Sequence, residues 1–270
     1  MNRAAAKEAD AEGPTVVGGL RAARPALLTI GLAVLLVTLV LALPYMQAPM
    51  HWLFPEVERP VYRLSSFTEL LASHLGLVLL SSLIATLVGV AAGIFATRDS
   101  GAEFEPLINA VTAIGQTFPP VAVLALAVPL LGYGGPPTLM ALAVYAALPV
   151  TEGTIAGLHA VPHDAKDAAE GLGFSKLRRL IDIELPLASP IILSGIRIAV
   201  IINIGTATIG STIGALTLGS PIIEGLAASN PAYVLEGAVV VALLAILVDR
   251  LFEHGVHWAQ RRSGVLAARG

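Results

Sequence analysis

The chain contains no cysteine among its 270 residues, and charged side chains make up only 13% of it. The absence of cysteine excludes disulfide bonds, thiolate zinc sites, iron–sulfur clusters and cysteine nucleophiles. The scarcity of charge is atypical of a water-soluble domain, in which about a quarter of the residues are charged. Several classes of redox-active, metal-stabilised and soluble protein are therefore excluded before any motif is considered.

Motifs for catalysis are missing as well. None of the three lysines, Lys7, Lys166 and Lys176, follows a glycine, so the sequence has no G-x-x-x-x-G-K-[ST] loop for binding and hydrolysing ATP. It has neither G-x-S-x-G nor H-E-x-x-H, and His51 and His74 lack carboxylates at metal-ligand spacing. We expect no catalytic residue, no metal site and no cofactor bound by this chain.

Aromatic residues are scarce, at 5%, and the net charge is only −3. No basic patch is interleaved with aromatic side chains, so we do not expect nucleic acid as a partner.

Long apolar runs dominate what is present. Hydrophobic residues make up 56% of the chain, and the mean hydropathy is +0.80. The length suffices for about six helices of about 20 residues each, and we expect an all-α, multi-pass membrane protein with a bundle of about six transmembrane helices. The expected spans are 25–43, 74–96, 106–131, 136–158, 187–216 and 233–251.

The distribution of Lys and Arg predicts the orientation. With the amino terminus in the cytoplasm, thirteen of the sixteen Lys and Arg residues fall in cytoplasmic segments, Arg59 and Arg63 lie outside, and Arg197 lies within a span. Because cytoplasmic loops are enriched in Lys and Arg, both termini are expected in the cytoplasm.

Residues 1–24 are expected to form a flexible tail, 25–65 the first span and an external segment, and 254–270 a carboxy-terminal tail. The first apolar run exceeds the usual length of a signal peptide's apolar region, so we expect it to be retained.

A polar segment, residues 162–186, interrupts the apolar runs. Within it Asp167-Ala168-Ala169 is followed by three residues, Gly173, nine residues and then Ile183-Glu184-Leu185-Pro186. The composition of 162–172 favours a short helix that Gly173 ends, and Ser175 is placed to cap a second helix that starts near Lys176. We expect two short helices set at an angle.

Two of the expected spans carry uncharged polar groups. In the third, Gln116, Thr117, Pro119 and Pro120 predict a broken helix, which is tolerated in a membrane where it lines a cavity or is buried between helices. In the fifth, the polar side chains are Asn203, Thr206, Thr208, Ser211 and Thr212. In both segments, lining of a transport path and simple packing between helices are alternative roles for these polar residues.

Glu152 and Arg197 are charged residues within predicted spans. Such charges are costly in lipid, so we expect them to pair with each other or to reach the cytoplasmic interface. Small residues spaced as in Gly89-x-x-x-Gly93 and Gly153-x-x-x-Gly157 predict close helix packing.

The spacing in 162–186 resembles the coupling loop of ABC importer permeases, written E-A-A, three residues, G, nine residues, I-x-L-P. Asp167 stands where that family usually has Glu. The runs at 74–82, 115–120, 204–209 and 242–249 are similar to permeases of osmoprotectant importers for glycine betaine, choline and related quaternary amines. Glu152 departs from related permeases, which often have a neutral or basic residue there.

The resemblance implies a type I ABC importer (MetI-like) permease fold, with a core at 66–253, in the bacterial cytoplasmic (inner) membrane. It implies three protein partners: an ABC ATPase subunit that uses ATP, a periplasmic or extracellular substrate-binding protein, and a second permease subunit, identical or paralogous. The implied ATPase-coupling residues are Asp167, Ala168, Ala169, Gly173, Phe174, Arg178 and Pro186. The implied path residues are Gln116, Thr117, Pro119, Pro120, Asn203, Thr206, Thr208 and Ser211.

Three other functions stay open from sequence. An ABC importer permease for another small solute, such as an amino acid, has the same architecture. An ion-coupled secondary transporter would need intramembrane carboxylates or a related pair of broken helices, neither of which is evident. A membrane scaffold that uses the same segment to bind a partner is a further alternative.

Overall fold

The computed structural model describes residues 16–263, and the regular secondary structure of that range is entirely helical, as expected. The α-helices are α1 (Val16–Ala42), α2 (Gln47–Leu53), α3 (Phe67–Ala96), α4 (Glu105–Thr117), α5 (Pro120–Leu131), α6 (Gly135–His159), α7 (His163–Gly171), α8 (Lys176–Arg179), α9 (Leu185–Ala207), α10 (Ser220–Ala227) and α11 (Pro231–Arg262). Short 3₁₀ segments are η1 (Leu43–Tyr45), η2 (Ala102–Phe104) and η4 (Thr208–Ile213), and η3 (Leu180–Glu184) is a π-helical turn.

Within the described residues, five helical segments are long and apolar enough to cross a membrane. They are α1, α3, α6, α9 with its flanking turns, and α11. Helices α4 and α5 pass the same test only as a pair, bent by 96° between Thr117 and Pro120, where the sequence predicts a break; counted as one broken span, they make six candidate spans. The expected number of about six spans is therefore confirmed.

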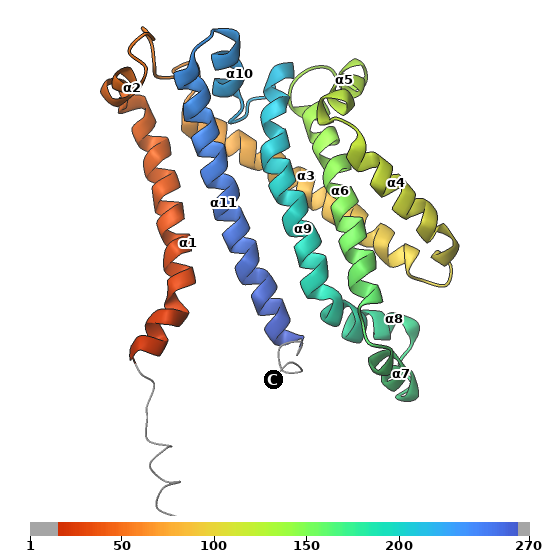
Figure 1. The fold of residues 1–270 in the computed structure, drawn as a ribbon. Helices are drawn as coiled ribbons and strands as arrows, with labels where there is room; N and C mark the ends of the chain where they lie inside the picture. The colour runs from red at the N-terminus through yellow and green to blue at the C-terminus, as the bar shows by residue number, and fades with distance from the viewer. Residues whose placement is uncertain (1–15, 264–270) are drawn as a thin grey trace, which may run out of the picture.

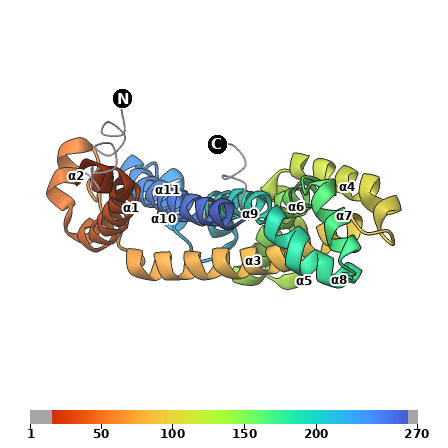
Figure 2. The same ribbon diagram turned by 90° about the horizontal axis from the view of Figure 1, so that it is seen from below.

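The helices form a row with one diagonal member. Helices α1, α11, α9, α6 and α4 stand side by side, and α3 crosses one face of the row (Figures 1 and 2). Helices α7 and α8 lie at the same end of the molecule as the start of α1 and the end of α11, whereas α2, α5 and α10 lie at the opposite end (Figure 1). We call the end that carries α7 and α8 the knob end, and the end that carries α2, α5 and α10 the α10 end.

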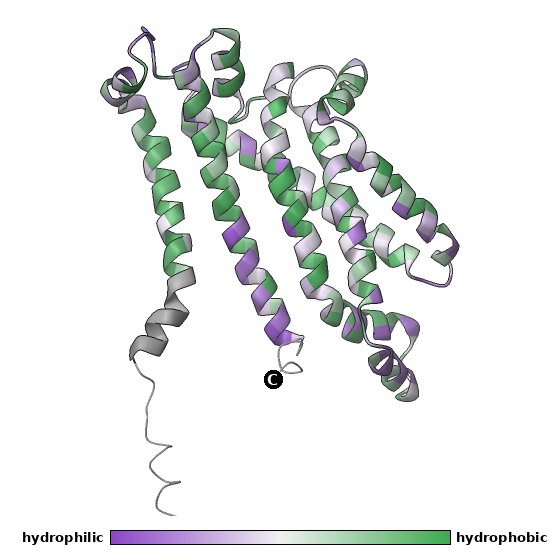
Figure 3. Ribbon diagram, viewed as in Figure 1, coloured by the Kyte–Doolittle hydropathy of each residue, from purple (hydrophilic) through white to green (hydrophobic). Residues whose placement is uncertain are grey.

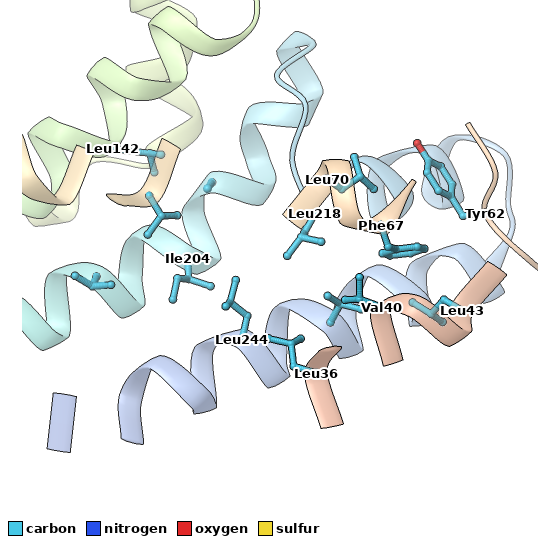
Figure 4. Close-up of a cluster of buried hydrophobic side chains, with 14 residues drawn as sticks. Leu36, Val40, Leu43, Tyr62, Phe67, Leu70, Leu142, Ile204, Leu218 and Leu244 are labelled. Carbon is cyan, nitrogen blue, oxygen red and sulfur yellow. The ribbon is translucent and has the colours of Figure 1, made fainter. Parts of the chain in front are cut away.

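Apolar side chains are divided between the interior and the outer surface. Leu36, Val40, Leu70, Ile204 and Leu244 belong to a buried cluster where α1, α3, α9 and α11 meet (Figure 4). Many other large apolar side chains remain exposed along the spans, which suits contact with lipid. In Figure 3 the apolar colour covers most of each span, and polar residues gather in α7, α8 and the last part of α11.

Small residues allow the close helix contacts that the sequence predicts. A Cβ atom built on Gly89 of α3 would lie 2.8 Å from Cβ of Val150 on α6, and one on Gly93 would lie 2.5 Å from Cβ of Thr154. On α6 and α9, a Cβ on Gly153 would lie 2.9 Å from Cα of Gly195. Backbones therefore touch at these crossings, as in small-residue packing of membrane helices.

The segment after the first span, which the sequence predicts to be external, is held by contacts with α11. The backbone N–H of Tyr62 donates to a carboxylate oxygen of the buried Glu236 at 2.9 Å, and Asn230 Nδ2 donates to the Arg59 carbonyl at 3.0 Å. The Tyr62 ring stacks edge to face with Phe67 and Tyr233.

Several boundaries differ from the sequence expectation. Helix α1 begins at Val16, so residues 16–24 are helical rather than part of a tail, and α11 continues through residues 254–262. Residues 1–15 and 264–270 of the expected tails lie outside the described residues. The fifth span becomes a 3₁₀ segment after Ala207. Helix α10 was not expected, because its eight residues are too few to give a clear period.

Candidate functional site

The polar segment folds into a helical knob, residues 163–179, made of α7 and α8. Helix α7 follows Pro162, and Gly173 adopts a left-handed conformation with φ of 77° two residues beyond its end. Glycine adopts this conformation at little cost. Ser175 caps α8, its hydroxyl accepting from the Arg178 backbone N–H at 3.3 Å. The two helices, their boundary and the cap agree with the local structure expected from the sequence.

The knob presents a partly apolar outer surface. Asp167, Ala168 and Gly173 are exposed, whereas Ala169 is buried against the rest of the chain. The side chains of Leu172 and Leu177 are 76% and 66% exposed. Exposed apolar groups beside a polar rim are typical of a surface that binds another protein.

Arg178 is held within the knob. Its guanidinium lies over the ring of Phe174, 4.2 Å from the centroid, and its Nε donates to Asp182 at 3.3 Å. Beside Phe174, a groove of about 390 Å³ runs between α7 and the end of α11 and reaches Pro186, Leu187 and Arg262.

Ion pairs fasten the knob to the end of α3. The buried Glu184 carboxylate accepts from Arg98 Nη2 at 2.6 Å and from Arg179 Nε at 2.9 Å. Lys176 also pairs with Asp99, and this exposed hydrogen bond lowers the pKa of the Asp99 carboxyl below its usual range. Arg98 and Glu184 were not assigned a role from sequence, because 86 residues separate them and no local pattern indicates their pairing.

The broken third span exposes polar groups at the α10 end. Thr117 ends α4, Phe118 and Pro119 are extended with ψ of 135° and 132°, and Pro120 starts α5. The Thr117 hydroxyl donates to the Ile114 carbonyl at 2.7 Å, and Gln116, Thr117 and Pro119 are exposed on the single chain. Exposed backbone of this kind needs a protein neighbour or water in a membrane.

The polar residues of the fifth span have different environments. Asn203 is fully buried and donates to the hydroxyls of Ser81 and Ser82 on α3 at 3.0 and 3.1 Å. Ser211 bonds the Thr217 hydroxyl at 2.7 Å. Thr206 and Thr208 are partly exposed, and α5, which follows the break, contacts η4. The structure thus brings Thr208 and Ser211 to the same end as the break but places Asn203 between α3 and α9.

Arg197 pairs with Asp249, not with Glu152. Arg197 Nε and Nη2 donate to the two Asp249 carboxylate oxygens at 2.6 and 2.7 Å, joining α9 to α11. Glu152 is exposed, and no ion pair of it occurs within residues 16–263. Of the two roles expected for Glu152 and Arg197, pairing with each other is therefore wrong. The sequence comparison of these two charges left out Asp249, which the packing of α11 against α9 brings to Arg197.

The Asp249→Asn variant tests the Arg197 pair. Removing the carboxylate leaves the Arg197 guanidinium without its charged partner in a membrane-spanning helix, so the variant should lose about 1.5–3 kcal/mol of stability, as for a hydrogen bond to a charged group. Thermal unfolding of the purified permease in detergent measures the loss. The control is Glu152→Gln, which should unfold at the wild-type temperature; equal destabilisation by both changes would contradict the assignment.

Membrane-length helices that carry a polar helical knob at one end define a multi-span membrane protein with an exposed surface for another protein. A family comparison is specific: residues 89–257 match the model of the binding-protein-dependent transport system inner membrane component. The chain belongs to this family. It is thus a multi-pass inner-membrane permease subunit of an ABC importer, with no ATPase site of its own, and a separate subunit hydrolyses ATP.

Sequence relatives include osmoprotectant permeases. The chain is 40% identical over 189 residues to the osmoprotectant import permease protein OsmY of Salmonella typhimurium, covering 70% of this chain and 78% of that protein. It is 38% identical over 177 residues to the choline transport system permease protein OpuBB of Bacillus subtilis, covering 65% of this chain and 80% of that protein.

Solved structures with the same fold include the MetNI methionine ABC transporter in inward-facing conformations. The match has a TM-score of 0.64 at 19% identity and covers 79% of this chain and 99% of that chain. A chain of an amino acid ABC transporter matches with a TM-score of 0.54 at 21% identity, covering 72% of this chain and 92% of that chain. These likenesses confirm the type I, MetI-like permease fold.

Proposed function

We propose that this chain is the permease of an ATP-driven importer of glycine betaine or a related quaternary amine osmoprotectant. The observation that carries the proposal is the similarity to permeases named for osmoprotectant and choline transport, at 40% and 38% identity over about two thirds of the chain. The family supplies the mechanism, in which an ATPase and a substrate-binding protein act with the permease.

The knob end is proposed to face the cytoplasm. The knob shares this end with the first described residue of α1 and the last residues of α11 (Figure 1), and Lys176, Arg178, Arg179, Arg261 and Arg262 lie there. An excess of Lys and Arg marks cytoplasmic segments. Both ends of the chain are then cytoplasmic, and the α10 end faces the binding protein.

The knob is proposed to dock on the ATPase. Asp167, Ala168, Gly173 and the exposed Leu172 supply the contact surface. Ala169, Phe174 and Pro186 support that surface from inside the knob and along the groove to α11, and Arg178 holds Phe174 in place.

The translocation path is proposed to form between this chain and a second permease subunit, identical or paralogous. Support comes from the broken span, which leaves polar and extended backbone groups exposed on the single chain where lipid would not satisfy them. The residues assigned to the path surface are Gln116, Thr117, Pro119, Pro120, Thr206, Thr208 and Ser211. Asn203, buried among Ser81 and Ser82, is assigned to the wall behind that surface.

Selectivity for quaternary amines is proposed to reside mainly in the binding protein. Aromatic cages are the usual means of binding such cations, and only 5% of this chain is aromatic. A permissive polar path is consistent with that scarcity.

Uptake by the reconstituted complex tests the function. Proteoliposomes that contain the permease, its ATPase and its binding protein should accumulate labelled glycine betaine only with ATP, and unlabelled choline should compete. Uptake of an amino acid that betaine does not inhibit would retain the importer and reject the substrate. Uptake driven by an ion gradient without ATP would reject the mechanism in favour of a secondary transporter.

A further inference from the structure

A chain of charged contacts runs from the knob to the end of α3. The Glu170 carboxylate on α7 pairs with Arg179 Nη1 at 3.3 Å, Arg179 Nε pairs with Glu184 at 2.9 Å, and Glu184 pairs with Arg98 at 2.6 Å. The contacts thus connect four segments, namely α7, α8, η3 and the residues that follow α3.

Glu184 is the central member because it is buried and uses both oxygens. Its side chain is 1% exposed, with Oε1 bound to Arg179 and Oε2 bound to Arg98. A buried carboxylate needs such charged partners because water does not solvate it. Because the guanidinium groups of Arg179 and Arg98 bind the same carboxylate, the position of one constrains the position of the other.

Helix α3 is the element that such a constraint would move. It crosses the row of helices (Figure 2), and its Gly89 and Gly93 lie against Val150 and Thr154 of α6 with no space for a Cβ atom. A displacement of the end of α3 is therefore passed to α6, because packed interiors shift as units.

The backbone at Glu184 is irregular. Residues Leu180–Glu184 form a π-helical turn between α8 and α9. Single π turns inside helices occur frequently at functional sites, and here the turn is the segment that presents Glu184 between the two arginines.

We infer that Glu184 is a positioning residue that joins the helical knob to α3 through Arg179 and Arg98, so that movement of the docked knob is passed to the transmembrane helices. The inference rests on the proposed docking of the knob on the ATPase. It assigns Glu184 and Arg98 to the transmission of movement and not to the docking surface, since neither is part of the exposed face of the knob.

The test uses the whole complex of permease, ATPase and binding protein in proteoliposomes. The readout is the ATPase rate with substrate-loaded binding protein divided by the rate without it, per assembled complex. Arg98→Gln disconnects α3 and leaves Glu184 paired with Arg179, and Glu184→Gln weakens both contacts. Each should reduce this ratio and the uptake by about tenfold, whereas the basal ATPase rate and the amount of bound ATPase should remain at wild-type levels.

Matched variants separate transmission from folding. Asp99→Asn removes the exposed Lys176–Asp99 pair, which also joins the knob to the residues after α3, and should leave the ratio unchanged because exposed pairs contribute little. The double variant Arg98→Gln/Glu184→Gln should be no worse than the poorer single variant, since each single change already breaks the Arg98–Glu184 ion pair. Glu184→Asp, which keeps the charge, should restore part of the ratio.

The possible results have separate meanings. A wild-type ratio for both Arg98→Gln and Glu184→Gln would overturn the inference while the docking proposal stands. Loss of ATPase binding in Arg98→Gln at an unchanged ratio per remaining complex would also overturn it, because the contact would then only stabilise the fold. Failure of docking itself is detected independently by substitution at Gly173.

Discussion

Gly173→Asp is expected to abolish ATP-driven uptake while the permease still folds and inserts. Gly173 is exposed, and a Cβ atom at this position would meet nothing within 4 Å, so the side chain itself is accommodated. The left-handed backbone at φ of 77° costs a non-glycine residue about 1–2 kcal/mol, and Asp is among the residues that tolerate it best. The new carboxylate lies on the proposed docking surface, where an unpaired charge at an interface is strongly unfavourable.

The measurement is uptake of labelled glycine betaine together with co-purification of the ATPase. Gly173→Asn is the matched control, because asparagine has nearly the same size and the same tolerance for the left-handed conformation but no charge. It should retain most of the uptake and of the bound ATPase. Full uptake by Gly173→Asp would refute docking through this surface, and equal loss in both variants would assign the effect to the backbone.

Gly195→Leu is expected to prevent formation of a stable permease. A Cβ atom on Gly195 would lie 2.8 Å from the Pro149 carbonyl oxygen and 3.1 Å from Cα of Gly153. Both are backbone atoms of α6, which cannot move aside as a flexible side chain would. We expect a loss of about 3 kcal/mol, at the upper end for overpacked cores, and separation of α6 from α9.

The yield and melting temperature of the purified permease in detergent measure this effect. Gly205→Leu is the control on the same helix, because a Cβ atom there would meet nothing within 4 Å, and it should unfold at nearly the wild-type temperature. A wild-type melting temperature for Gly195→Leu would show that the α6–α9 contact is not close-packed in the membrane.

The knob was predictable because local chemistry determines it. Gly173 and Ser175 each act within a few residues of their own position, through a left-handed turn and an N-cap, so the sequence alone indicates both helices. The break at Pro119 and Pro120 was predictable for the same reason, since proline removes a backbone donor wherever it occurs.

Contacts between distant segments were not predictable. Arg98 meets Glu184 across 86 residues and Arg197 meets Asp249 across 52, and a single sequence carries no signal for either pair. The polar type of Asn203 suggests a place on the path, whereas its hydrogen bonds to Ser81 and Ser82 depend on the crossing of α3 over α9, which the sequence does not indicate.

The ion pair at the polar end of α11 relates the protein to the thickness of its bilayer. The part of α11 from Pro231 to the residue before Asp249, in which the buried Glu236 is the one charged residue, is about 27 Å long at about 1.5 Å per residue, slightly shorter than a typical hydrocarbon core of about 30 Å. A thicker membrane would draw Arg197 and Asp249 into hydrocarbon, and a thinner one would leave them in the headgroup region. Lipids with shorter acyl chains should therefore support this permease better than longer ones.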